Sequence, residues 1–390
     1  ATDTDARALC RPDGRWHRRS GDTGAVAMQL APPRPATRAS DEPVLVTWRS
    51  LAPTYALAAL ATLAVAIFAV SWGRTHIPPQ TTLAVLLDHL PWISVGDHDA
   101  TTDAITWQVR APRVVLAGLV GATLAFAGAS YQAVFRNPLA EPYLIGVAAG
   151  ASLGATLIII SPLFVMTWII SPVPPAAFAG AIIAVALAYS LARSGHAVPT
   201  TSLILSGVAV SSIGTALVTY LMLTYSERTL AILTWILGGF NTATWTDVAI
   251  ALPYMLLAAV VILPYARLLN VLQLDEDQAR QLGVDVGRVR MIVLVLASLA
   301  TAAAVSVSGL IGFVGLVVPH TVRMIWGPDY RRVLPLSAFF GASFLILADI
   351  AARSFNGERE IPIGVVTALI GAPFFLLLMR RANRPLYEEA

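Results

Sequence analysis

The sequence predicts an all-α membrane protein that crosses the bilayer many times. Hydrophobic residues make up 56% of the 390 residues and charged residues only 13%, whereas soluble domains carry roughly 25% charged residues. The mean hydropathy is +0.70, and the apolar residues form long charge-free runs between short charged stretches. Because no soluble core could bury this much apolar surface, we expect the bilayer to be the solvent for most of the chain.

The apolar runs predict about ten membrane spans, since one span needs roughly 20 apolar residues. Residues 142–192 are long enough for two spans with a break at 172–175, and residues 291–322 hold two more with a hinge near Ser308 and Gly309. The other predicted spans are 50–73, 114–134, 201–223, 248–266, 333–350 and 363–379. Residues 230–237 are apolar but too short to cross, so we expect a re-entrant or surface helix there.

The chain divides into two predicted parts. Residues 1–47 are rich in Arg, Asp, Pro and Ala without an apolar period, which predicts a disordered extension. Residues 48–384 form the predicted ten-helix transmembrane domain, and residues 268–287 are its longest inner loop. The single cysteine, Cys10, excludes an internal disulfide and a cysteine-based zinc site.

The loops differ in charge, and this difference predicts the orientation of the chain. One set of loops carries arginines, namely Arg193, Arg267, Arg280, Arg288, Arg290, Arg323, Arg331, Arg332, Arg380, Arg381 and Arg384. The other set carries carboxylates, namely Asp88, Asp97, Asp99, Asp103, Glu227, Glu358 and Glu360. The positive-inside rule therefore places both termini in the cytoplasm. The net charge of +3 is typical of such loops, and no nucleic-acid partner is expected.

Several catalytic and nucleotide-binding patterns are absent from the sequence. All 26 basic residues are arginine, so a GxxxxGK[ST] phosphate loop is impossible, and HExxH and CxxC do not occur. His89 and His98 stand among Asp88, Asp97 and Asp99, but a solvated outer loop is favoured over a metal site. We expect no metal, no cofactor and no catalytic activity.

Two other classes of membrane protein are disfavoured. An ion-coupled carrier retains ionisable pairs at mid-membrane depth, and we expect no buried ionisable pair in the predicted spans. Asp349 lies near the outer end of its span, four residues before Arg353, which is the spacing of a helical ion pair, and Arg113 lies at the outer mouth of another span. An intramembrane enzyme needs a paired His/Asp/Glu or Ser/Lys set within the spans, and the sequence offers none.

Glycines at helical spacing predict close contacts between helices. They recur every four residues from Gly146 to Gly154 and every three residues from Gly309 to Gly315. Small residues let helix backbones approach closely in lipid, so packing is favoured over a glycine-lined pathway.

A series of motifs extends along the predicted spans. In chain order they are RAPR from Arg110, QAVFRNPLAEP from Gln132, GVAAG from Gly146, GGF from Gly238, LDEDQARQLGV from Leu274, SGLIGFVGLVVPHTVR from Ser308, ADIAAR from Ala348, PIGVVTA from Pro362 and GAP from Gly371. In this order, from about residue 48 to residue 381, the sequence resembles the FecCD-type permeases. These are the membrane subunits of ABC importers for ferric siderophores, haem and cobalamin.

Residues 274–284 predict a short helix outside the membrane. Acidic residues at its start and Arg280 near its end suit the helix dipole, and Gly283 can adopt the left-handed stop. The resemblance implies that this is the coupling helix, which is held in a cleft of the ATPase subunit; a surface linker helix is the alternative. The residues assigned to it are Leu274, Asp275, Ala279, Arg280, Leu282 and Gly283.

Three arginines map to the outer face, namely Arg110, Arg113 and Arg353. Cations at a membrane rim are often interfacial anchors. The resemblance implies instead that these arginines receive acidic residues of a substrate-binding protein, an interaction that mainly governs orientation and association rate.

Two inner loops carry the residues of an expected gate. Asn137 and Leu139 close one loop, and Thr200, Thr201 and Ser202 close the next. Turn chemistry and helix capping are the alternative explanation. The resemblance implies that these loops form a cytoplasmic gate, with Pro199 as a departure from the small polar residue common there. Residues 230–237 then match the family's short extra helix at the outer gate.

The resemblance also implies an assembly and a cargo. It predicts the permease of a type II ABC importer in the bacterial inner membrane, with a second copy of the chain, two ATP-binding subunits in the cytoplasm and one substrate-binding protein outside. The cargo would pass by alternating access without chemical change. A ferric siderophore is the expected cargo, with cobalamin or haem as alternatives.

Overall fold

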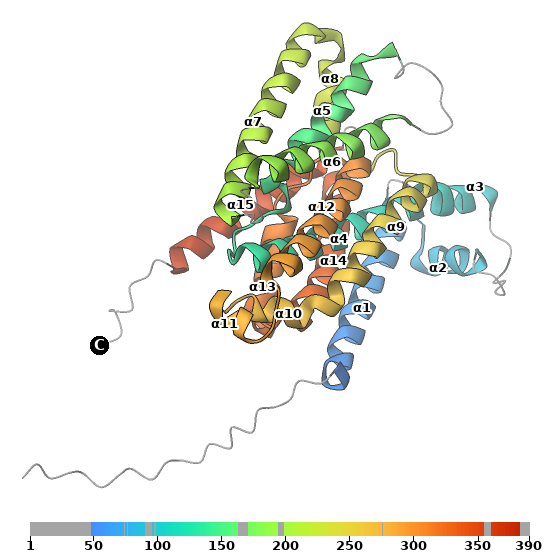
Figure 1. Cartoon of the computed structure of the whole chain (residues 1–390). Helices are drawn as coiled ribbons and strands as arrows, with labels where there is room; N and C mark the ends of the chain where they lie inside the picture. The colour runs from blue at the N-terminus through green and yellow to red at the C-terminus, as the bar shows by residue number, and fades with distance from the viewer. Residues whose placement is uncertain are drawn as a thin grey trace, which may run out of the picture. The chain divides into compact units, whose positions relative to one another are not determined.

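The structure is a computed structural model that describes residues 48–73, 75, 77–89, 96, 99–162, 171–193, 199–274, 276–354 and 360–382. Every regular element in this part of the chain is a helix (Figure 1). The all-α prediction is therefore confirmed. The expected disordered extension, residues 1–47, lies outside the described residues.

Seven helical segments in the described residues are long and apolar enough to cross a membrane. Five of them are single helices: α1 (Trp48–Ser71), α6 (Val173–Ala192), α7 (Thr200–Thr224), α12 (Val286–Ser308) and α14 (Tyr330–Ser354). The other two are continuous runs of several elements. Ala100–Phe135 ends in α4 (Ala111–Phe135), and Trp245–Val271 contains α9 (Trp245–Ile262), η5 (Leu263–Tyr265) and α10 (Ala266–Val271). Three shorter apolar helical stretches occupy the remaining predicted spans: α5 (Val147–Ile160), α13 (Val314–Trp326) and the part Ile363–Leu377 of α15 (Ile363–Ala382). Each predicted span thus corresponds to one helical segment.

The second span begins earlier than the sequence predicts. Its helix starts with α3 (Ala100–Asp103), continues through a π-helical turn, η1 (Ala104–Arg110), and only then becomes α4. Arg110 and Arg113 interrupt the apolar run and made position 114 the expected start. In the folded chain both arginines find partners within the protein, so the helix continues through them.

The breaks between helices follow glycine positions. α12 ends at Ser308, Gly309 has a φ of +67°, and α13 begins at Val314 after Phe313, whose φ is +68°. The predicted hinge near Ser308 and Gly309 is therefore confirmed. The predicted short helix at 230–237 is also present as α8 (Thr229–Ile236), preceded by the turn η4 (Ser226–Arg228).

A stack of rings joins α2 (Pro79–Asp88) to η1 and α9. The ring of His89 lies 4.1 Å from that of Trp107, and Trp107 lies 4.9 Å from Trp245. His89 is also 3.6 Å from Asp103. A structural role explains His89 without a metal, while His98 lies outside the described residues.

The core of the bundle is α4, which is buried along nearly its whole length. It contacts α14, α12, α13 and α9, and glycines bring the backbones together. A Cβ atom on Gly121 would overlap the backbone of Gly341, and one on Gly128 would overlap the carbonyl group of Gly315. Such close approach is the main source of helix association in lipid, where burial of apolar surface gains little.

The glycines of α5 serve the same purpose. A Cβ on Gly150 would overlap the backbone of Gly180, and one on Gly154 would overlap the carbonyl group of Ala176. The packing interpretation of the glycine repeat is therefore confirmed for α5 and α6.

Replacing Gly128 by Ala should destabilise the bundle, because the added methyl group forces α4 and α13 apart. We expect a loss of about 1–3 kcal/mol, the usual cost of overpacking, measured as a lower thermal unfolding temperature of the purified protein. Gly287 in α12 is a matched control, since a Cβ there meets its nearest atom at 3.6 Å. Equal effects of Gly128→Ala and Gly287→Ala would contradict the packing explanation.

Candidate functional site

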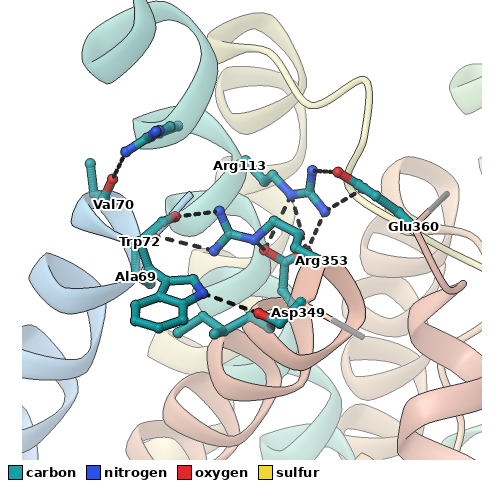
Figure 2. A network of polar contacts seen from close by, with 10 residues as sticks. Ala69, Val70, Trp72, Arg113, Asp349, Arg353 and Glu360 are labelled. Atoms are coloured by element: carbon teal, nitrogen blue, oxygen red, sulfur yellow. Dashed lines mark hydrogen bonds and ion pairs between the residues drawn. The ribbon is translucent and has the colours of Figure 1, made fainter. Parts of the chain in front are cut away.

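One end of the bundle carries an arginine network. It contains Arg113, Asp349, Arg353 and Glu360 (Figure 2), and we include Arg110, which binds the same end of α1 as Arg353. Its centre is the guanidinium of Arg113, at the start of α4. This group donates to Asp349 through Nε at 3.0 Å and Nη2 at 2.8 Å, and to Glu360 through Nη2 at 2.9 Å and Nη1 at 3.2 Å. One arginine thereby joins the end of α14 to the residues that precede α15.

Two other arginines of the network stabilise the end of α1. Arg353 lies 3.1 Å from Asp349 and donates to the carbonyl groups of Trp72 at 3.1 Å and Ala69 at 3.3 Å. Arg110 donates to the carbonyl groups of Val70, Ser71 and Thr75 at 2.6–3.1 Å. Both cations therefore satisfy carbonyl groups that a helix C-terminus leaves without partners.

Burial in the network corrects one sequence-based expectation. Asp349 is only 1% exposed and pairs with both Arg113 and Arg353, so the statement that no buried ionisable pair exists was wrong. The predicted helical pair of Asp349 and Arg353 is confirmed. The pair lies in the last turns of α14, which ends at Ser354, and this is not the mid-span position typical of ion-coupled carriers.

The structure brings the three predicted docking arginines together, but not as free cations. Arg110 is 7% exposed, and the side chains of Arg113 and Arg353 are each 11% exposed. Sequence reasoning missed Glu360 as the partner of Arg113, because 247 residues separate the two. The presence of Glu360 among the acidic loop residues was the one available signal.

A groove of about 860 Å³ lies along one face of α7. Its polar lining includes the hydroxyl groups of Ser211, Thr215 and Thr219, which recur every four residues, together with Glu141 and Tyr143. The rest of the lining is mostly apolar, and the hydroxyl group of Thr219 donates to the carbonyl group of Thr215 within α7, so this face is compatible with a protein partner or with a partly polar path. The sequence analysis did not identify this face.

Glu141 and Tyr143 tie the wall of the groove to the start of α13. Glu141 accepts a hydrogen bond from the backbone N–H of Phe313 at 3.0 Å, and the hydroxyl of Tyr143 donates to the carbonyl group of Ile311 at 2.9 Å. Burial raises the pKa of the Glu141 carboxyl, while the N–H of Phe313 opposes that shift.

The expected gate residues lie on two separate segments. Asn137 follows α4 and accepts a hydrogen bond from the N–H of Leu139 at 2.9 Å, which makes a tight turn, and Leu139 is 43% exposed. Thr200, Thr201 and Ser202 form the first turn of α7. In the region that the structure describes, no hydrogen bond joins these two groups. Instead, α7 meets the neighbouring turn η2 (Pro142–Ile145), where a Cβ on Gly207 would overlap the carbonyl group of Leu144.

The predicted short helix is α11 (Glu276–Gln281). It ends as expected at Gly283, whose φ is +77°, with the N–H of Val284 bonded to the carbonyl group of Ala279 at 3.2 Å.

Ala279 is fully buried, whereas Leu274 is 42% and Leu282 63% exposed. Arg280 is also exposed, and Asp275 lies outside the described residues. Two exposed leucines therefore flank α11, one before its first residue and one after its last.

Contacts that the sequence did not reveal connect this helix to the core. Arg136, at the end of α4, donates to the carbonyl group of Leu272 at 2.6 Å, and Gln273 donates to that of Ala133 at 3.1 Å. Asn270 donates to Asp329 at 2.7 Å, in the turn before α14. Burial alone would raise the pKa of Asp329, but hydrogen bonds from Arg331 and Asn270 hold it below its ordinary value. The segment that leads to α11 is therefore held against α4 and α14.

Comparisons with known proteins agree on one family. Residues 61–381 match the family described as the FecCD transport family. The chain is 43% identical over 336 residues to the cobalamin import system permease protein BtuC of Halobacterium salinarum, covering 84% of this chain and 88% of that protein. It is 38% identical over 295 residues to the hemin transport system permease protein HmuU of Yersinia pestis, covering 72% and 86%. It is 40% identical over 281 residues to the Fe(3+) dicitrate permease protein FecD of Escherichia coli, covering 71% and 85%.

A solved structure shares the fold. This structure, of an inward-facing metal-chelate type ABC transporter, superposes with a TM-score of 0.73 at 32% identity and covers 85% of this chain and 99% of its own. Matched motifs, helical order and fold lead to the same conclusion. The chain belongs to the FecCD transport family and is a permease of the ABC importer type.

Proposed function

We propose that this chain is the non-catalytic transmembrane subunit of an importer that moves a metal chelate into the cytoplasm. The observation that carries the proposal is α11, a short helix flanked by the exposed apolar residues Leu274 and Leu282 on a chain without a nucleotide-binding loop. Such exposed apolar residues outside the membrane need a protein partner. A pair of ATP-binding subunits is the partner that the family implies.

The orientation follows from this partner. α11 faces the cytoplasm, with both termini on the same side, and the arginine network faces outward from the bacterial inner membrane. The arginine-rich loops support this orientation through the positive-inside rule. Arg113 and Arg353 then meet the acidic residues of one substrate-binding protein, while Arg110 supports them by holding the end of α1.

A second copy of the chain completes the path. The groove beside α7 is open, and α7 exposes large apolar side chains such as Leu205 and Leu223 beside the hydroxyl groups. Two such faces around one axis enclose a polar path and keep its hydroxyl groups away from lipid. Asn137, Leu139 and the first turn of α7 then form the inner gate of that path.

The groove also bears on the cargo. Ser212 and Thr219 donate their hydroxyl protons to carbonyl groups of α7 at 2.9 Å, so they present acceptor lone pairs to the groove, as Glu141 does. Acceptors favour a cargo that carries N–H or O–H donors and no net negative charge. A ferric siderophore of that kind fits, and so does the amide-bearing cobalamin; an anionic iron citrate fits less well. The similarity to a cobalamin permease favours cobalamin as the second candidate.

Reconstitution in proteoliposomes tests the function. The chain alone should hydrolyse no ATP, because it lacks a phosphate loop. Together with its ATPase subunits and binding protein, it should accumulate radiolabelled cyanocobalamin or a ferric siderophore in an ATP-dependent manner. Hydrolysis by the isolated chain, or uptake driven by an ion gradient without ATP, would overturn the proposal.

The substitution Leu282→Asp tests the coupling role of α11. Placing a charge in an apolar cleft should weaken binding of the ATPase subunit by at least about tenfold, measured by co-purification and by stimulated ATP hydrolysis. Leu282→Met keeps the apolar volume and is the control. If both variants bind the ATPase subunit alike, α11 is a surface linker.

The substitution Arg113→Glu tests docking at the other end. Charge reversal should reduce affinity for the binding protein by more than about tenfold, as expected for a charge pair at an interface. Thermal unfolding is measured alongside, because the substitution also removes one of the two arginines that pair with the buried Asp349. Arg113→Lys keeps the charge but loses the two-bond geometry and should have an intermediate affinity. Docking that is unchanged in Arg113→Glu would refute the role.

A further inference from the structure

The cationic centre of the proposed docking surface is already occupied within the chain. A guanidinium has five N–H donors. In Arg113, Nε and Nη2 donate hydrogen bonds to Asp349, while Nη1 and Nη2 donate to the two carboxylate oxygens of Glu360 at 3.2 and 2.9 Å (Figure 2). Glu360 thus covers the edge that a carboxylate from another protein needs for a two-bond pairing.

The two carboxylates of the network differ in how firmly they are held. Asp349 is 1% exposed and is shared by Arg113 and Arg353, whereas the side chain of Glu360 is 29% exposed. Among the described residues, Glu360 receives hydrogen bonds from Arg113 alone. Releasing Asp349 would leave buried charges without a partner, while Glu360 can return to water at small cost. Glu360 is therefore the group that can exchange.

The backbone beside Glu360 is held in place. The N–H of Ile361 donates to the carbonyl group of Ala352 at 3.1 Å, and that of Ile363 donates to Gly238 at 3.2 Å. Rotation of the Glu360 side chain would therefore free the Nη1 and Nη2 donors of Arg113 that it now occupies, without movement of the helices. The three arginines of the network exceed its two carboxylates, so a net positive charge attracts a further carboxylate.

We propose that Glu360 is an internal substitute for a partner carboxylate. It occupies Arg113 in the undocked permease, and an acidic side chain of the substrate-binding protein displaces it on docking. This exchange keeps Arg113 paired in both states, and it lowers the affinity of the undocked surface for unrelated acidic proteins. The inference rests on the docking role proposed above.

The substitution Glu360→Gln tests the exchange because it removes the competing charge with little change of shape. The dimeric permease is placed in nanodiscs, and association of the importer's own substrate-binding protein is followed by surface plasmon resonance. We expect affinity to increase roughly 3- to 10-fold with faster association, as for the loss of a partly exposed competing ion pair. Glu227→Gln removes an exposed carboxylate in another of the predicted outer loops, and its effect should stay within about twofold.

The direction of the effect separates the possible outcomes. If Glu360 has only a structural role, Glu360→Gln should weaken docking and lower the unfolding temperature. Either unchanged or weaker docking of this variant overturns the exchange. If the wild-type permease does not bind the protein at all, the proposed docking function fails instead.

A second readout needs no partner and applies equally to Glu360→Ala. Phenylglyoxal should modify Arg113 faster in either Glu360 variant than in the wild type, as measured by mass spectrometry. Equal rates in the variants and the wild type would refute the substitution role of Glu360.

Discussion

Close contact between helix backbones around α4 is the constraint on which the rest of the structure depends. Within a bilayer, moving an apolar side chain from lipid to protein gains little free energy, so dispersion between closely packed backbones has to hold the helices together. Gly121 against Gly341 and Gly128 against Gly315 provide this contact on two sides of α4. Because α4 is packed along nearly its whole length, the positions of both its ends are determined with it.

The two ends of α4 carry the two candidate partner surfaces. Its first turn holds Arg113 and thereby the arginine network, while its last residues meet the segment that leads to α11 through Arg136 and Gln273. A single rigid helix therefore connects the proposed docking end to the proposed coupling end. Rigid-body movement of helices is the usual way in which closure of one subunit reaches the opposite side of a membrane protein. The groove beside α7 lies on the face of the bundle that we propose a second copy covers.

The arginine network shows how charges are tolerated at a helix end in this environment. Arg110 and Arg353 lose much of their contact with water, but they gain carbonyl groups at the end of α1 that have no partner within that helix. Asp349 is neutralised by two arginines, so its burial is compatible with a stable fold. Glu360 belongs to the same network but remains partly solvated, which gives the network one exchangeable member.

Local patterns in the sequence were sufficient for the all-α class, the apolar spans, the hinge after Ser308, the short helices α8 and α11, and the ion pair between Asp349 and Arg353. Each of these depends on residues within a few turns of one another, where hydropathy, glycine conformation and helical spacing act directly. The tertiary structure alone decided the early start of the second span, the burial of Arg110, the pairing of Arg113 with Glu360, the contacts of Arg136 and Gln273, and the groove at Glu141. These features join residues that are far apart in the chain, up to 247 positions for Arg113 and Glu360. The free energy of a charged side chain depends on such distant partners, and no local pattern specifies them.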